Sequence, residues 1–415
     1  MSGPETARHL IRLVAAALVI ALVGAACSSD GDGVVADSTP SEVPTREAVV
    51  PGSGEIPQAG DDTPAEFLEL DASLEVLADE FVIPWAIEIL GPDEFLVSER
   101  TGGLVHVVDG GRTVLAGIPR SETVFADPLI LGGVNDVSLH PRFEQNGLVY
   151  LAYIDTAFRM VVGRFDFSER VVRDFEVIFE STDFSIGSRF AWPDDDHFFL
   201  TQGAAGSPFP DPGPQDLDSD SGKIHRLRAD GSIPEDNPVF DGFDGPTSTW
   251  SYGHRDAQGL LFDDGVLYSN EHGPLGGDEL NVIEKGGNYG WPLFSFGLNY
   301  DSTPVGDLTP EEAAEFTVLP LKGWGPDFNM APSGLTRLRD SAFPEWDGAL
   351  VWGALAQQRL IAYLPEEDRT VVLLDGIGRV RDVAQLPDGD LLILRDAVPD
   401  VRWGDVVRVS PRSAG

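Results

Sequence analysis

The sequence predicts an all-β protein, a six-bladed β-propeller built of four-stranded antiparallel blades. From residue 71 onward, short β runs alternate with turns rich in Gly, Asp and Pro, and convincing amphipathic helices are absent apart from a short one expected over Glu311–Phe316. A unit of two or more β runs recurs six times along the chain. The main structural alternative, a β-sandwich, is disfavoured because roughly 340 residues are too many for one sandwich.

Each predicted unit starts with one β run, continues through an Asp/Gly/Pro turn, and returns in a second run rich in Leu, Val and aromatic residues. WAIEIL-GPDE-FLVSER, which starts at Trp85, is the first example. The other units begin at Gly133, Gly187, Gln258, Ser333 and Arg381. Further β runs such as LVHVVDG and KIHRLRADG follow the pairs, so that each unit supplies one blade.

The N-terminus predicts export and lipidation. Arg8 and Arg12 precede an apolar run over residues 13–23, which is short for a membrane span, and VGAAC follows. Small residues directly before a lone cysteine resemble a bacterial lipobox, in which Cys27 becomes the acylated first residue; the alternative is an ordinary signal peptide. We therefore expect a lipoprotein signal peptide over 1–26, an acylated cysteine and disordered acidic linker over 27–70, and the propeller over 71–412.

Composition limits the partners of this chain. With 28 basic and 69 acidic residues, the formal charge of −41 argues against nucleic acid and against a polybasic membrane patch. Contact with a membrane is expected only through the lipid anchor, at the bacterial cell surface or in the periplasm. Cys27 is the single cysteine, so no intrachain disulfide can form.

Ligands of propellers lie at one end of the central channel, and the starts of the predicted units are therefore the candidate site. Arg189, Arg255, Arg379 and Arg381 occur there. An arginine in this position can close neighbouring blades through a salt bridge. Several arginines converging in so acidic a chain indicate a multi-anionic ligand instead. The stretch Trp250–Pro292 combines Gly and Pro with carboxylates, which suggests a hard cation.

Six motifs in this order resemble the soluble pyrroloquinoline quinone (PQQ) dependent aldose dehydrogenases, the glucose/sorbosone dehydrogenase family. They are GSIPEDNP, YGHRDAQG, NEHGPLGGDELN, KGGNYGWP, FPEWDGALVWGAL and GRVRDV, and the likeness spans about Val82 to Val409. The resemblance implies a six-bladed propeller that holds PQQ and Ca²⁺ over the channel mouth. It also implies hydride transfer from a sugar to the quinone while a histidine takes the hydroxyl proton.

The resemblance assigns roles residue by residue. It implies that Ca²⁺ beside the cofactor is held by carbonyls of Gly273 and Pro274, and that a second, structural Ca²⁺ uses Glu279 and the carbonyl of Tyr289. The positions that it implies for cofactor binding are Arg255, Asp256, Gln258, Trp324, Arg379 and Arg381.

The chain departs from the family where the reaction would occur. The position of the base histidine, four residues before Arg189, is Ser185, and no catalytic residue is assigned with certainty. His272 is a possible substitute base. A glutamine, a supporting acid and a lysine of the family are matched by Leu131, Ala204 and Ala356, and an asparagine by Asp256. Loss of a general base alone typically costs about 10²–10⁴ in rate.

Residues outside this group receive structural interpretations. His254 is interpreted as structural and His140 as a turn or core residue. The acidic run Asp216–Gly222 resembles the start of an EF-hand loop, but its glycine is one place late and the closing acid is missing, so a solvated loop is expected.

The sequence therefore predicts an exported lipoprotein that resembles aldose dehydrogenases and, if active, oxidises a sugar at its anomeric carbon, passing electrons to an acceptor that the sequence does not name. The alternative is a non-catalytic propeller that binds carbohydrate, calcium or a surface partner. A third hypothesis, Ca²⁺-dependent lactone hydrolysis, would need Asp136, Asp256 and Glu271 to converge.

Overall fold

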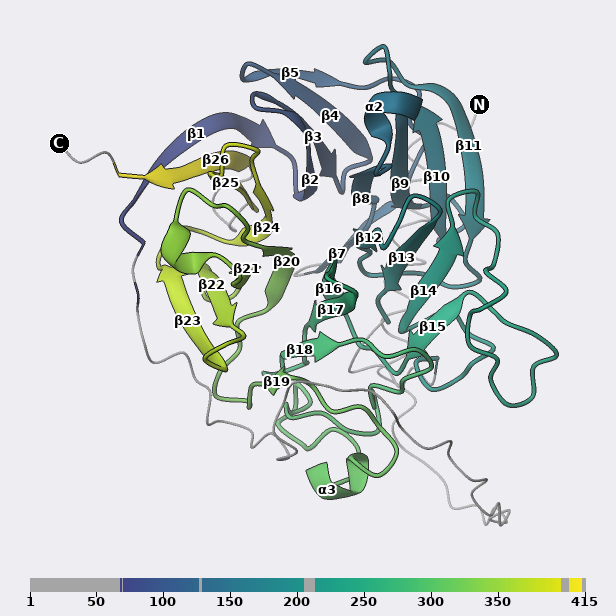
Figure 1. Ribbon diagram of the computed structural model, residues 1–415. Coiled ribbons are helices and arrows are strands. Elements are labelled where there is room, and N and C mark those ends of the chain that lie inside the picture. Colours follow the sequence, from purple (N-terminus) through teal and green to yellow (C-terminus); the bar gives the residue numbers. More distant parts are fainter. Residues whose placement is uncertain (1–67, 69, 127–128, 205–212, 397–402, 413–415) are drawn as a thin grey trace, which may run out of the picture. The chain divides into compact units, whose positions relative to one another are not determined.

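Six four-stranded antiparallel sheets are arranged as blades around a central axis, as Figure 1 shows. The computed structural model describes residues 68, 70–126, 129–204, 213–396 and 403–412. The predicted all-β, six-bladed propeller is thereby confirmed. The signal peptide, Cys27 and nearly all of the predicted linker lie outside the described residues.

The blades follow one another along the chain, and the first strand of each lies nearest the axis. Blade 1 is β2 (Pro84–Gly91), β3 (Glu94–Glu99), β4 (Gly103–Val108) and β5 (Gly111–Val114). Blade 2 is β8 (Val134–Leu139), β9 (Leu148–Ile154), β10 (Met160–Asp166) and β11 (Arg173–Glu180). Blade 3 is β12 (Phe190–Ala191), β13 (His197–Gln202), β14 (Lys223–Arg228) and β15 (Thr249–Tyr252).

The second half of the ring repeats this order. Blade 4 is β16 (Ala257–Asp263), β17 (Val266–Glu271), β18 (Glu279–Val282) and β19 (Lys322–Gly323). Blade 5 is β20 (Pro332–Arg337), β21 (Leu350–Ala354), β22 (Arg359–Leu364) and β23 (Arg369–Leu374). Blade 6 is β24 (Val380–Gln385), β25 (Leu391–Arg395), β26 (Gly404–Pro411) and, as its outer strand, β1 (Ala72–Phe81).

The ring is closed by the two ends of the propeller segment. β1 pairs antiparallel with β26, from Ala72 opposite Pro411 to Phe81 opposite Gly404. Blade 6 therefore contains strands from both ends of the described chain. This closure ties the first blade to the last, so separating the two requires breaking a whole strand pair.

The hydrophobic core is divided into clusters that lie between neighbouring blades. β25 shows why: Leu391 and Ile393 pack in the cluster shared with blade 5, whereas Leu392 and Leu394 pack in the cluster shared with blade 1. Successive side chains of a strand point to opposite faces, and both faces of each blade are covered. The apolar runs of the sequence, such as LLIL, are explained by this double burial.

Helical segments are short in the described residues: α2 (Phe143–Asn146), α3 (Pro310–Ala313) and the 3₁₀ turn η1 (Pro344–Trp346). The helix predicted over Glu311–Phe316 is α3, shorter and one residue earlier; Thr309 caps it through a capping box with Glu312. Among the described residues, no helix is long and apolar enough to cross a lipid bilayer.

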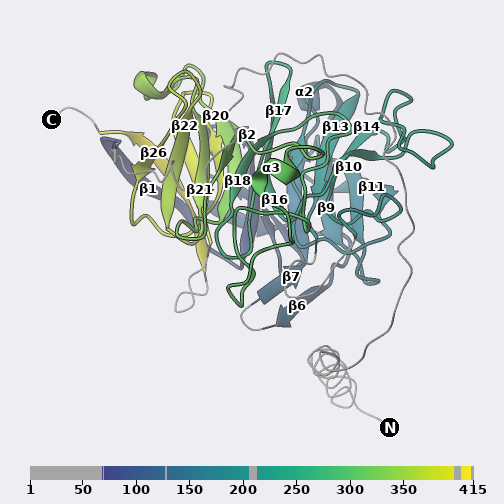
Figure 2. The same ribbon diagram turned by 90° about the horizontal axis from the view of Figure 1, so that it is seen from below.

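One hairpin departs from the blade pattern. β6 (Thr123–Ala126) and β7 (Leu129–Gly132) pair with each other between blades 1 and 2, and Figure 2 shows them projecting beyond one end of the blades. Because β7 ends at Gly132, two residues before β8, the hairpin marks the end of the channel at which the inner strands begin.

Candidate functional site

Antiparallel pairing brings residues from all parts of the chain to one end of the channel. The inner strand of a blade begins at the end where its second strand finishes. Arg255 and Asp256 directly precede β16, and His272 directly follows β17. In blade 6, Arg379 precedes β24 and Asp396 follows β25. We call this end of the channel the mouth.

Three of the predicted site residues, Asp256, Gln258 and Arg381, form one hydrogen-bonded chain at the mouth, and His272 lies next to it. Nδ1 of His272 lies 3.6 Å from Oδ2 of Asp256, which accepts a hydrogen bond of 2.8 Å from the amide of Gln258. Oε1 of Gln258 accepts a bond of 2.7 Å from Arg381. Arg381 also donates to Asp396 at 3.0 Å. The chain connects blade 4 to blade 6 across the mouth.

Positive charge is concentrated around the ring of Trp85. The guanidinium carbons of Arg100, Arg381 and Arg189 lie 3.8, 4.5 and 5.4 Å from its centroid. Burial, together with repulsion from Arg381 and Arg189 that is partly offset by two carboxylates, lowers the pKa of Arg100 to about 9. Burial also lowers the pKa of Arg381. A group of cations so crowded suits an anionic ligand.

Trp85, Arg100 and Asp396 were not among the residues predicted from the sequence. A signal for two of them was present, because Arg100 and Asp396 each come directly after the second strand of a blade. At the ends of the second strands, the sequence interpretation considered His272–Pro274 and Ala204 but not Arg100 or Asp396. The ends of the second strands lie at the same end of the channel and contribute equally.

Arg189 braces the blades, as the simpler of the two interpretations predicted. Its guanidinium donates to the carbonyls of Gln258, Trp85 and Arg381 at 2.9, 3.0 and 3.0 Å. It also donates to Asp382 at 3.0 Å and to Asp136 at 3.4 Å. Arg189 therefore joins β12 to the inner strands of blades 1, 2, 4 and 6.

The inner strands line a cavity of about 310 Å³ that contains three acidic side chains as well as Arg189. Burial and the neighbouring Asp382, opposed by Arg189, raise the pKa of Asp136 to about 7. Burial raises the pKa of Glu88 well above its usual value, and the charges of Asp136 and Asp382 act in the same direction. Asp136 pairs with Arg189, and among the described residues no group of three or more His, Cys, Asp or Glu side chains comes together, so the predicted acidic convergence for lactone hydrolysis is not formed.

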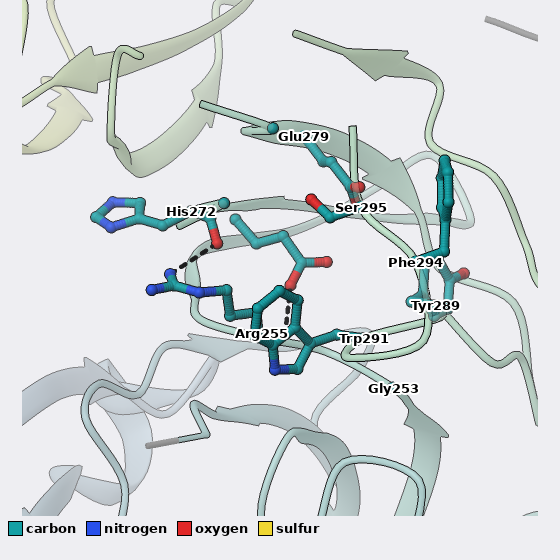
Figure 3. Close-up of a pocket in the computed structure, with 11 residues that line it drawn as sticks. Gly253, Arg255, His272, Glu279, Tyr289, Trp291, Phe294 and Ser295 are labelled. Atoms are coloured by element: carbon teal, nitrogen blue, oxygen red, sulfur yellow. Dashed lines mark hydrogen bonds between the residues drawn. The ribbon is translucent and has the colours of Figure 1, made fainter. Parts of the chain in front are cut away.

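A second, much smaller cavity of about 10 Å³ lies beside the mouth in blade 4 (Figure 3). Its space is about that of one water molecule or ion. Its lining residues are Gly253, Arg255, Glu271, His272, Gly273, Gly277, Glu279, Tyr289, Trp291, Phe294 and Ser295. Figure 3 shows Glu279 next to Ser295 on one side and His272 with Arg255 on the other.

Two buried carboxylates face this small cavity. Glu271 accepts hydrogen bonds from the backbone N–H of Arg255 at 2.9 Å and from Asn281 at 2.9 Å, and Asn281 also donates to Glu279 at 3.1 Å. Burial raises the pKa of Glu279 well above its usual value, and the charge of Glu271 adds to this effect. Within the described ranges no cluster of three or more His, Cys, Asp or Glu side chains forms a metal centre. A cation here would rely on two carboxylates plus carbonyl and hydroxyl oxygens, a donor set that suits Ca²⁺.

The Gly273–Pro274 turn is fixed to blade 5 by Asp278. Asp278 accepts from the backbone N–H groups of Gly273 at 3.0 Å, Met330 at 2.7 Å and Ala331 at 2.9 Å. A Cβ at position 273 would lie 1.9 Å from the carbonyl oxygen of Gly276, so only glycine fits. The turn predicted to hold Ca²⁺ through its carbonyls is therefore rigid.

The remaining predicted positions are away from the mouth or carry no polar side chain there. Ser185 is fully buried; its hydroxyl donates to the carbonyl of Gly187 and accepts from the N–H of Gly203 at 3.1 Å. Ala204 is buried and donates its N–H to the carbonyl of Arg255. Ala356 is exposed, and the side chain of Leu131 lies outside the described residues.

The backbone of Trp324 bonds to Gly277 and Asp278 beside the mouth, but its side chain is buried. Its side chain is 1% exposed and packs in the core between blades 4 and 5, with the ring of Trp352 6.1 Å away. Because both faces of the indole are covered by core residues, this burial does not favour the predicted packing of Trp324 against a cofactor.

The histidines are held by protein partners. His272 Nε2 lies 2.9 Å from the carbonyl of Pro332, and burial lowers its pKa. Nε2 is occupied by the carbonyl of Pro332, so Nδ1, which faces Asp256, is the nitrogen that could accept a proton. The role of His272 as a substitute base stays a prediction. His254 is fully buried between Ser251 and Glu271 and stacks on Tyr289 at 4.5 Å, which agrees with its structural interpretation.

Two further regions agree with the simpler interpretations. His140 accepts from the N–H of Arg142 and packs against Trp192. In the acidic run, Asp220 accepts from the N–H of Thr182, and its own N–H donates to Asp183. These hydrogen bonds hold the run against Thr182 and Asp183.

Comparison with known proteins shows the family to which the chain belongs. The family model described as "Glucose / Sorbosone dehydrogenase" matches residues 81–401. Aldose sugar dehydrogenase YliI of Escherichia coli is 32% identical over 358 residues, which are 82% of this chain and 93% of that protein. The crystal structure of the soluble E. coli aldose sugar dehydrogenase in its apo-form superposes with a TM-score of 0.71 at 32% identity, covering 82% of this chain and all of that one.

A more distant structure shares the fold. The PQQ-bound form of an aldose sugar dehydrogenase from Streptomyces coelicolor has a TM-score of 0.64 at 24% identity, covering 82% of this chain and 98% of that one. Since the family model spans most of the propeller and the E. coli relative is matched over almost its whole length, the chain belongs to the glucose/sorbosone dehydrogenase family.

Proposed function

We propose that the protein binds PQQ at the channel mouth, with Ca²⁺ at the Gly273–Pro274 turn, and oxidises a sugar at its anomeric carbon. The observation that carries this proposal is the convergence of arginines on one end of a chain with a formal charge of −41. The Nε atoms of Arg255 and Arg381 are buried and find no hydrogen-bond partner among the described residues. Such orphaned donors are costly unless a ligand accepts from them.

The residues present fit a cofactor with several carboxylates. Arg381 and the part-exposed Arg379 lie on either side of Asp396, 3.0 and 3.9 Å from it, so both guanidinium groups are held in place before a ligand arrives. The guanidinium of Arg255 is held by a hydrogen bond of 3.0 Å to the carbonyl of His272. The name of the Streptomyces protein states that it binds PQQ, which supports the same ligand here.

PQQ, when bound, supplies the two-electron chemistry by accepting a hydride from the sugar. The residues of this chain bind and orient. Arg379 and Arg381 neutralise carboxylates, and Gln258 holds Asp256 and Arg381 in register. The carbonyls of Gly273 and Pro274 present oxygen ligands to a hard cation.

A second Ca²⁺ is proposed for the small cavity of blade 4. The carboxylates of Glu271 and Glu279 lie there beside the segment that carries Arg255. A cation between them would offset their mutual repulsion. It would also stiffen the connection between β17 and β18, which carries His272 and the Gly273–Pro274 turn.

A non-catalytic binding propeller is the second candidate. It is favoured by Ser185, whose hydroxyl is consumed by backbone partners and cannot accept a sugar proton. Without a dedicated base, turnover is expected to be about 10²–10⁴-fold below that of an enzyme that has one.

The deciding experiment reconstitutes the purified protein with PQQ and Ca²⁺ and follows PQQ binding by absorbance titration and dye reduction with a panel of aldoses. Arg381→Ala should weaken PQQ binding about 100-fold, as expected for removal of one partner from a buried charged pair. Arg339→Ala is the matched control, since Arg339 is an exposed arginine paired with Asp263 and Asp264. Absence of PQQ binding by the wild-type protein would refute the proposal; binding without turnover would favour the second candidate.

Export as a lipoprotein remains a separate proposal, supported by Arg8, Arg12, the apolar run and the VGAAC sequence that ends at Cys27. Labelling of expressing cells with a fatty-acid analogue should tag the wild-type chain and not Cys27→Ser. An untagged wild-type chain that is nevertheless secreted would indicate an ordinary signal peptide.

A further inference from the structure

Tyr300 is an exposed aromatic residue at the mouth for which the cofactor site provides no role. It is 58% exposed, and its hydroxyl accepts a hydrogen bond of 3.3 Å from Nη2 of Arg255. The guanidinium of Arg255 in turn lies 5.4 Å from the ring centroid of Trp291. An arginine that belongs to the mouth is thus in contact with a tyrosine whose ring remains largely in solvent.

The loop that carries Tyr300 is braced from both sides. Leu298 and Leu275 exchange backbone hydrogen bonds of 3.0 and 3.1 Å, which tie the loop to the residue next to Pro274. Within the loop, the N–H of Asn299 donates to the carbonyl of Thr303 at 2.8 Å, and its side chain donates to the carbonyl of Pro304 at 2.8 Å. Tyr300 is therefore presented at a defined position beside the predicted cation turn.

An exposed aromatic ring on an ordered loop is suited to pack against a flat ligand. The ring offers a large apolar area, and a tyrosine has only two side-chain torsions to order when a ligand packs on it. A pyranose sugar has one face made of C–H groups and a rim of hydroxyls. The tyrosine face matches the first, and the arginine and tyrosine hydroxyl beside it match the second.

We propose that Tyr300 is the platform on which the C–H face of the sugar substrate packs, and that it selects pyranose sugars. The inference rests on the proposed function, because it names the residue that receives the substrate of that site. It differs from a positioning role, in which Tyr300 would act only by holding Arg255 for the cofactor.

The test compares Tyr300→Ala with Tyr300→Phe, which keeps the ring but loses the hydroxyl. Sugar binding is measured by calorimetry on the full mature protein, with and without PQQ and Ca²⁺, and PQQ binding is titrated separately. Tyr300→Ala should raise the Kd and the KM for an aldopyranose about tenfold with little change in kcat, given the usual strength of aromatic packing. Tyr300→Phe should stay within about twofold of the wild type. Phe316→Ala is the matched control, since Phe316 belongs to the same β18–β19 insertion and is 50% exposed.

The outcomes separate the platform from the cofactor site. If Tyr300→Phe and Tyr300→Ala weaken PQQ binding equally and leave the Kd for sugar unchanged, Tyr300 is a positioning residue and the platform is refuted. A wild-type protein that binds PQQ but no pyranose also refutes it. A protein that binds pyranose through Tyr300 but takes up no PQQ supports the platform and refutes the proposed function.

Discussion

The two sides of the mouth that belong to blades 3 and 4 are neighbours but are built differently. The blade 4 side carries charged and hydrogen-bonding side chains, including Arg255, Glu271 and His272. The blade 3 side is closed by backbone and small residues. A Cβ at Gly203 would lie 3.0 Å from Oδ1 of Asp256, so this buried carboxylate oxygen, for which the described residues supply no hydrogen-bond partner, faces a glycine.

Blade 3 nevertheless supports blade 4. The N–H of Ala204 donates to the carbonyl of Arg255 at 2.7 Å, and the N–H of Gly203 donates to Ser185. Blade 3 therefore serves to fix the backbone of the neighbouring Arg255. The difference separates two tasks: blade 4 presents groups suited to an anion and a cation, whereas blade 3 contributes packing and backbone hydrogen bonds.

Calcium removal should affect the blade 4 side most. If Ca²⁺ occupies the small cavity, a concentration 100-fold above its Kd should raise the free energy of unfolding by about 2.7 kcal/mol relative to chelator. Thermal unfolding with Ca²⁺ and with chelator measures the difference, and Glu279→Gln should remove most of it, because the cavity loses one of its two carboxylates.

Asp218→Asn is the matched control, since Asp218 is an exposed acid in the run that only resembles a calcium loop. If the stabilisation by Ca²⁺ persists in Glu279→Gln but disappears in Asp218→Asn, the ion binds in blade 3 and not in blade 4.

The fold was accessible from the sequence because each blade buries both faces. Runs such as LLIL in β25 and LVYLAYI in β9 can be recognised locally, and their recurrence gives the number of blades. The extra β6–β7 hairpin was not predicted, since two short strands outside a blade share no repeat with the others. The length of α3 also differed, because a capping box fixes where a helix begins but packing decides where it ends.

The site was only partly accessible for a different reason. Arg381, Gln258 and Asp256 were found from their motifs, and the structure joins them in one chain of hydrogen bonds. The packing of Trp324 and the position of Trp85 among three arginines depend on contacts between blades. Local sequence does not encode which indole is covered by a neighbouring sheet and which one is not.

The pH dependence of the free energy of unfolding should show whether Asp136, the partner of Arg189, is protonated in the folded protein. The pKa of Asp136 is raised from its ordinary value to about 7, chiefly by burial. Between about pH 4 and pH 7 the folded state therefore keeps a proton that the unfolded state has lost, and the free energy of unfolding falls as pH rises, by at most about 1.4 kcal/mol per pH unit for this group.

Asp136→Asn cannot ionise, so its stability should fall less steeply over this range in denaturant titrations at several pH values. Asp230→Asn is the control, because hydrogen bonds from Ser232 lower the pKa of Asp230 and its effect has the opposite sign below pH 4. An unchanged slope in Asp136→Asn would mean that Arg189 holds this carboxylate ionised throughout.

Ser185→Ala should have the smallest effect on stability, and it tests most directly whether blade 3 contributes only packing. Its hydroxyl satisfies the buried N–H of Gly203, so its loss should lower the free energy of unfolding by about 1–2 kcal/mol. Neither PQQ affinity nor the turnover of the loaded protein should change. Ser341→Ala is a matched control, since Ser341 is also buried and its hydroxyl likewise bonds a residue two positions on, at Phe343. If Ser185→Ala alone reduced turnover tenfold or more at equal stability, blade 3 would take part in the reaction after all.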